Sequence, residues 1–152
     1  MRIRGPLGMA AALLSVCLSA PVHAGVAANT SVIKDYLDLC SPEADASCVA
    51  PGASHAADGS GKVVYDCHTG NIILRAHGMA AGKTFELRSG HAGAEGDEVI
   101  VGSATAQDGD SVLIKARQPL GTLGESWTLW LVADDGPATR VLQGHRSHCA
   151  SE

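Results

Sequence analysis

The sequence has little that would identify an enzyme. It lacks the G-x-S-x-G elbow that presents the nucleophile of many hydrolases. It also has neither a G-x-x-x-x-G-K-[ST] phosphate loop nor a G-x-G-x-x-G motif between a strand and a helix. The C-x-x-C spacing typical of cysteine-rich zinc sites is missing as well. No motif therefore points to nucleophilic hydrolysis, nucleotide binding or a cysteine-bound metal.

Positive charge is also scarce. The chain has 11 Lys and Arg against 16 Asp and Glu, a formal net charge of −5. Loss of the first 24 residues would remove Arg2 and Arg4 and no acid, so the balance would become 9 − 16 = −7. No run of basic residues offsets the acids, and an acidic surface repels phosphates. Nucleic acid and anionic membrane surfaces are therefore not expected partners.

The N-terminus reads as an export signal. Two arginines precede an apolar run from Leu7 to Leu18, which is shorter than the roughly 20 residues that span a bilayer. Val22 and Ala24 satisfy the small-residue rule for signal peptidase. We therefore predict that residues 1–24 are a signal peptide cleaved after Ala24, and that the protein is secreted or periplasmic. A retained anchor and a lipoprotein modified at Cys17 are the alternatives, and no later stretch is apolar enough to span a membrane.

Cysteine usage agrees with export. Removing Cys17 leaves Cys40, Cys48, Cys67 and Cys149, and an even number in a small exported domain predicts two disulfides. Chain entropy does not separate the three pairings. Cys40–Cys48 and Cys67–Cys149 are favoured, because the first pair is close in sequence and the second joins the first expected strand to the end of the last.

Residues 25–61 are expected to precede the main domain. Apolar residues between Ser31 and Leu39 recur with helical spacing, after polar residues suited to an N-cap. This pattern predicts a short helix over 31–39. The stretch from Ser41 to Gly61 is rich in Ala, Gly, Ser and Pro, which indicates a linker.

From Lys62 onward, short strand-like runs alternate with turn signals. The expected strands are 62–67, 71–76, 83–88, 98–106, 111–117, 126–133 and 139–143. The run 83–88 alternates between apolar and polar residues, and 126–133 is apolar on both faces. Trp127 and Trp130 face opposite ways, so at most one is expected in the main core. The other is expected to be covered by the N-terminal helix, and the alternative is that it is exposed and binds a ligand.

These features predict a mainly β fold. The favoured form is a seven-stranded antiparallel β-sandwich over residues 62–149, of immunoglobulin or fibronectin type III size, followed by a tail over 150–152. A small meander barrel is the alternative. The layout is similar to that of immunoglobulin-like modules in exported bacterial proteins, although the Cys–Trp–Cys pattern of true immunoglobulin domains is not met.

Histidines offer the one candidate metal site. His145 and His148 are three positions apart, and His148 and His68 each adjoin a cysteine of the favoured Cys67–Cys149 pair. A disulfide would bring those two backbones to within about 7 Å. His68, His145 and His148 could then hold copper or zinc, for which imidazole is a common ligand.

The sequence therefore favours a non-enzymatic exported module, acting by binding a protein or an envelope component or as a structural part. A histidine-based copper- or zinc-binding envelope protein is the second hypothesis. An enzyme with a site built from loops is the third.

Overall fold

The computed structural model describes residues 31–43, 48, 52, 55–90, 97–107 and 109–150. The predicted signal peptide and its cleavage site lie outside these residues. The described chain forms eight strands and one short 3₁₀ turn. They are β1 (Val32–Leu39), β2 (His55–Asp66), β3 (Asn71–Met79), β4 (Thr84–Gly90), β5 (Val99–Thr105), β6 (Val112–Arg117), η1 (Leu120–Thr122), β7 (Ser126–Val132) and β8 (Thr139–His145).

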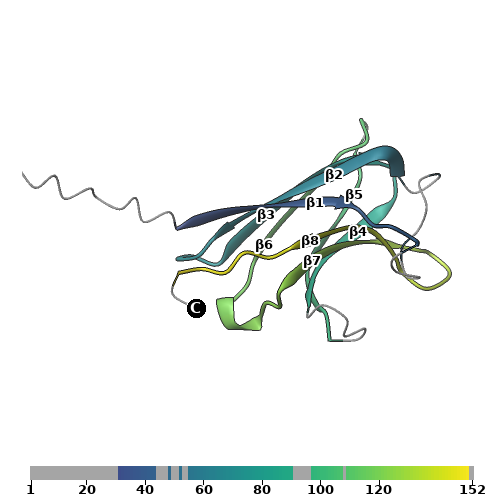
Figure 1. Ribbon diagram of the computed structural model, residues 1–152. Coiled ribbons are helices and arrows are strands. Elements are labelled where there is room, and N and C mark those ends of the chain that lie inside the picture. The colour runs from purple at the N-terminus through teal and green to yellow at the C-terminus, as the bar shows by residue number, and fades with distance from the viewer. Residues whose placement is uncertain are drawn as a thin grey trace, which may run out of the picture.

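The strands form one antiparallel sheet that nearly closes on itself like a barrel. Their order is β5-β4-β7-β8-β1-β2-β3-β6. Most strands pair with a sequence neighbour, and the pairs β1–β8, β3–β6 and β4–β7 join strands that are further apart in the chain. The terminal strands β5 and β6 also meet, because a Cβ on Gly102 of β5 would lie 2.9 Å from Cγ2 of Ile114 of β6. In Figure 1, β1 and β2 (blue) run above β7 and β8 (green and yellow).

The core fills the space that this sheet encloses. Alternate residues of each strand point inward, as expected for strands with one buried face. The fully buried apolar side chains include Leu37, Tyr65, Ile72, Leu74, Phe85, Leu87, Ile114, Trp127, Leu129 and Leu142. The mainly β prediction is confirmed, and the alternation predicted for residues 83–88 appears in β4, where Phe85 and Leu87 are buried.

The helix predicted over Ser31–Leu39 is wrong, because these residues form β1. The helical reading treated Asp35 as a surface residue, but Asp35 is buried and points inward with Leu37. Once Asp35 counts as an inward residue, the segment alternates with period two. Val32 and Ile33, which are β-branched, also fit a strand better than a helix.

The predicted linker up to Gly61 and the count of seven strands also need correction. His55–Gly61 is the first half of β2, so it belongs to the sheet. Gly61 faces the core, where a Cβ would lie 3.1 Å from Cδ1 of Leu142. The glycines of this stretch therefore reflect tight packing inside a strand. With β1 added, the described chain has eight strands.

No helix among the described residues is long and apolar enough to cross a membrane.

Candidate functional site

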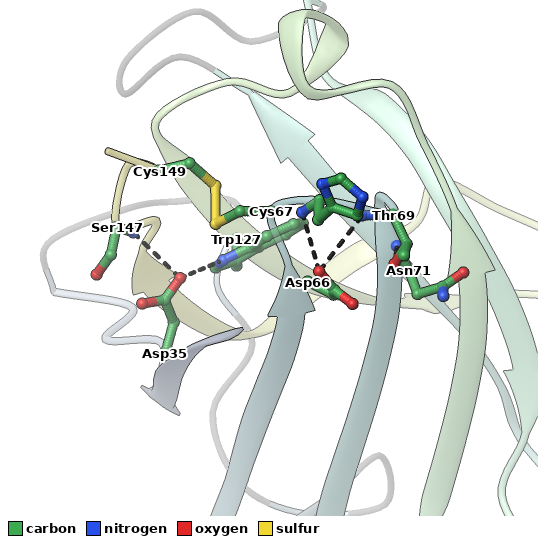
Figure 2. Close-up of a disulfide and its surroundings, with 9 residues drawn as sticks. Asp35, Asp66, Cys67, Thr69, Asn71, Trp127, Ser147 and Cys149 are labelled. Atoms are coloured by element: carbon green, nitrogen blue, oxygen red, sulfur yellow. Dashed lines mark hydrogen bonds between the residues drawn. A yellow bond between two sulfur atoms is a disulfide. The ribbon is translucent and has the colours of Figure 1, made fainter. Parts of the chain in front are cut away.

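Two disulfides tie the sheet to its flanking segments. Cys40–Cys48 and Cys67–Cys149 are bonded, with Cα–Cα distances of 5.4 and 5.8 Å. These are the pairs favoured from the sequence. The Cys67–Cys149 bond joins the end of β2 to the segment after β8 (Figure 2). Disulfides are consistent with an oxidising compartment such as the periplasm or the cell exterior.

The predicted metal ligands lie at this end of the molecule. The rings of His145 and His148 are 6.5 Å apart between centroids, and both residues are exposed. His68 is exposed as well, next to the Cys67–Cys149 bond. Within the described part of the chain, no group of three or more His, Cys, Asp or Glu is placed to hold a metal ion. The structure thus brings two of the three histidines together, and the metal site stays a prediction.

The turn between β2 and β3 is organised by Asp66. Its Oδ1 accepts hydrogen bonds from the backbone N–H groups of His68, at 2.9 Å, and Thr69, at 3.3 Å (Figure 2). The bond from His68 is the largest cause that lowers the pKa of the Asp66 carboxyl, and the contact with Thr69 adds to it. This carboxylate therefore stabilises the turn that follows it.

A larger feature is the basic outer face of β1, β2, β3 and β6. Its outward positions carry five of the eleven Lys and Arg of the chain. They are Lys34, Lys62, Arg75, Lys115 and Arg117, and we call them the basic face. The outward positions of these strands also include three acids, Asp38, Asp58 and Asp66, so the formal charge on the face is 5 − 3 = +2. A net negative protein thus presents one positive surface.

The register places two cations directly opposite each other on this face. Lys62 of β2 pairs with Arg75 of β3, and on its other side Lys62 pairs with Tyr36 of β1. Directly opposed side chains have Cβ atoms about 4.5–5.5 Å apart, and like charges there are unfavourable. Among the described residues, neither Lys62 nor Arg75 makes an ion pair.

The outer surface of the other strands is balanced by contrast. Arg88 bonds Glu86 at 2.7 Å and lies 3.9 Å from Glu98, and Arg140 lies 3.8 Å from the same Glu98. Both guanidinium groups stack on Trp130, at 4.7 and 4.9 Å from its ring. Trp127 is the tryptophan in the core, and Trp130 lies under the two arginines. The prediction that the N-terminal helix covers the second tryptophan is wrong, because residues 32–39 form a strand.

A hollow of about 290 Å³ opens at one corner of the basic face. Its polar and aromatic lining comes from Tyr36, Asp38, Ser60, Lys62, Arg75 and His77. Tyr36 is 65% exposed, and Nζ of Lys62 lies 5.8 Å from the centroid of its ring. The hollow thus combines an exposed aromatic ring, two cations without acidic partners, and groups that can donate or accept hydrogen bonds.

Sequence reasoning missed this surface because its members come from four strands. The two cations closest in sequence, Lys115 and Arg117, are still separated by one residue, so the five cations form no run. Strand register gathers them. The one available signal was that Lys34, Lys62, Arg75 and Lys115 each lie at an outward position of a strand. This signal can be used only if residues 32–39 are assigned as a strand that pairs with β2.

No family model matches this sequence, and no curated protein or solved structure is significantly similar to it.

Proposed function

We propose that this chain is a non-enzymatic binding module of the periplasm or the cell exterior, and that its basic face binds an anionic envelope component. The observation that carries the proposal is the direct pairing of Lys62 with Arg75, neither of which makes an ion pair among the described residues, although Asp38 lines the same hollow. Folded domains commonly break a local rule where a functional site requires it.

The contrast with the opposite surface supports this assignment. Arg88 and Arg140 have Glu98 nearby, so their charges contribute to the fold. The next row of cross-strand partners on the basic face runs from β1 to β6. It has Lys34 and Lys115 at its ends and the half-buried Val64 and Ile73 between them. Positive charge that is spread over the outer face of a sheet attracts an extended anionic partner, and this attraction weakens as salt screens it.

Retention on an immobilised sulfated polymer tests this function. At low salt, the protein should be retained despite its net negative charge, and it should elute as salt rises. The double variant Lys62→Gln/Arg75→Gln should elute at clearly lower salt. Lys83→Gln removes one exposed charge from the turn before β4 and is the control for non-specific charge loss. Absence of retention, or equal elution of all variants, would contradict the proposal.

Export is the second part of the proposal. The two disulfides support an oxidising location. Mass spectrometry of the protein recovered from the periplasm or the medium should find an N-terminus at Gly25 and no free thiol. Recovery from the cytoplasm with four reduced cysteines would overturn this part.

A second candidate function is copper or zinc binding, favoured by the 6.5 Å between the rings of His145 and His148. Dialysis against copper or zinc, followed by elemental analysis, should then find one bound ion per chain. His145→Ala should abolish that binding, while His77→Ala, on the basic face, should leave it intact. Clearly substoichiometric metal in the unaltered protein would exclude this function.

A further inference from the structure

We propose that the hollow beside Tyr36 is a subsite for one carboxylated or sulfated sugar unit of a polysaccharide. This inference rests on the proposed function and names the ligand class for the basic face. It assigns the sugar ring to Tyr36, and the anionic group to Lys62 and Arg75.

Charge defines where the anion binds. Lys62 and Arg75 are cross-strand partners, so one carboxylate or sulfate can contact both head groups. Arginine can hold such a group through two parallel hydrogen bonds. Binding would also relieve the repulsion between the two cations. A neutral sugar offers no such gain.

Tyr36 provides a platform for the ring. Its side chain is 65% exposed on β1, although large aromatic side chains usually bury most of their surface. Lys62 reaches toward the ring, with Nζ 5.8 Å from the centroid. A pyranose ring has C–H groups that can pack against an aromatic face, while its hydroxyls remain free for polar contacts.

The remaining lining suits hydroxyl groups. Asp38 and Ser60 stand beside Tyr36 at the same corner, and His77 adjoins Ser60 through the β2–β3 register. Carboxylate, hydroxyl and imidazole can each accept or donate to a sugar hydroxyl. A volume of about 290 Å³ lies near the lower limit of small-molecule pockets, which begins at about 300 Å³. The hollow is therefore matched to one unit rather than to a long segment.

The rest of the basic face can hold the neighbouring units of a linear chain. Lys34 and Lys115 lie in the row next to Lys62 and Arg75, and Arg117 lies one row further. Successive outward rows are about 6.5–7 Å apart along the strands. Anionic groups repeated along a polymer can therefore meet successive cations.

The area of the face favours a polymer over a folded protein partner. Four neighbouring strands of six residues cover roughly 400 Å², from the usual strand spacing and rise. Stable protein interfaces bury about 800 Å² on each side. The outward rows contain one aromatic residue, Tyr36, whereas single-stranded nucleic acid is usually bound by several stacked rings. The exposed Val32 and Leu113 lie at opposite corners of the face, so they form no patch for insertion into a membrane.

Isothermal titration with defined polymers tests the subsite. The probes are polygalacturonate, dextran sulfate, neutral dextran, inorganic polyphosphate, single-stranded DNA and vesicles of anionic lipid. We expect measurable binding to one or both acidic polysaccharides, weaker binding to polyphosphate, DNA and vesicles, and none to neutral dextran.

Three variants separate the sugar subsite from general attraction of anions. Arg75→Gln should weaken binding of the acidic polysaccharide by about tenfold, the usual effect of losing a charge-assisted hydrogen bond. Tyr36→Ala should weaken that binding severalfold, with unchanged affinity for polyphosphate, while Tyr36→Phe should retain it. Lys83→Gln is the control. These side chains lie on the surface, and thermal unfolding of each variant checks that its fold is intact.

The outcomes distinguish the two proposals. Polyphosphate, DNA or vesicle binding as tight as polysaccharide binding, without an effect of Tyr36→Ala, would overturn the sugar subsite and leave the anionic binding face standing. Equal binding of neutral dextran would also overturn the subsite. Failure of every anionic probe to bind would overturn both proposals.

Discussion

The indole of Trp127 donates a hydrogen bond to Asp35, 92 positions earlier in the chain. Nε1 of Trp127 lies 2.8 Å from Oδ2 of Asp35, and the backbone N–H of Ser147 donates to the same oxygen at 3.1 Å (Figure 2). Both side chains are buried. One carboxylate thus connects β1, β7 and the segment that carries Cys149, at the end of the sheet closed by the Cys67–Cys149 disulfide.

This contact predicts the effect of replacing Asp35. Asp35→Ala leaves the buried Trp127 N–H without its acceptor, so we expect a loss of about 1–3 kcal/mol in the free energy of unfolding. Asp35→Asn keeps an acceptor oxygen and should lose less. Asp38→Ala, at an exposed position of the same strand, is the control and should change stability by less than about 0.5 kcal/mol. Urea unfolding measures all three, and an Asp35→Ala protein as stable as the control would refute this role.

The two disulfides should differ in their effect on stability. Cys67–Cys149 spans 82 positions and Cys40–Cys48 spans 8. The chain-entropy estimate gives about 4.5 kcal/mol for the longer loop and about 2.5 kcal/mol for the shorter one. Cys67→Ser/Cys149→Ser should therefore destabilise the protein more than Cys40→Ser/Cys48→Ser. Chemical unfolding of the two variants checks this order, and the reverse order would contradict it.

His55 should make stability depend on pH. Its side chain is 2% exposed, and burial lowers the pKa of the imidazole below its ordinary value. The folded state therefore favours neutral His55. This contribution to stability is fully present above about pH 6.5, the unfolded value, and is lost as pH falls through the lower folded pKa.

Replacing His55 tests this dependence. His55→Gln should flatten the decline of the free energy of unfolding below about pH 6.5. His77→Gln, at an exposed position of β3, should keep the decline. The measurement is urea unfolding across the pH range, and an unchanged slope in His55→Gln would show that another group causes the decline.

Gly144 should tolerate no side chain. A Cβ there would collide with the backbone carbonyl of Tyr36, where β8 passes β1. Because backbone must move to relieve this contact, we expect Gly144→Ala to destabilise by about 2 kcal/mol or more. Gly121→Ala is the matched control, since nothing lies within 4 Å of the added atom. Thermal unfolding compares the two, and equal stability would contradict the close approach of β8 and β1.

Local signals predicted much of the sheet. The alternation of Phe85 and Leu87 located β4, and the turn signal between the expected strands 62–67 and 71–76 agrees with the β2–β3 turn. Gly70 has a φ of 70° there, a conformation that glycine adopts readily. The disulfide pairs also followed from positions relative to the expected strands. The immunoglobulin-like layout and the signal peptide stay predictions.

Long-range contacts explain what the sequence could not predict. β1 was read as a helix because the reason for a buried Asp35 is Trp127, which lies far along the chain. Trp130 is covered by Arg88 and Arg140, which come from two other strands. The Lys62–Arg75 pair depends on register, and a slip of one residue in either strand would turn that strand's cation toward the core.

The most direct test of the binding face is a titration of isotopically labelled protein with an acidic oligosaccharide, followed by NMR. We predict that the amide signals of Tyr36, Lys62 and Arg75 shift with saturation, while those of Arg88 and Trp130 on the opposite surface stay in place. Shifts confined to Arg88 and Trp130, or no saturable shift with any acidic oligosaccharide, would contradict the account.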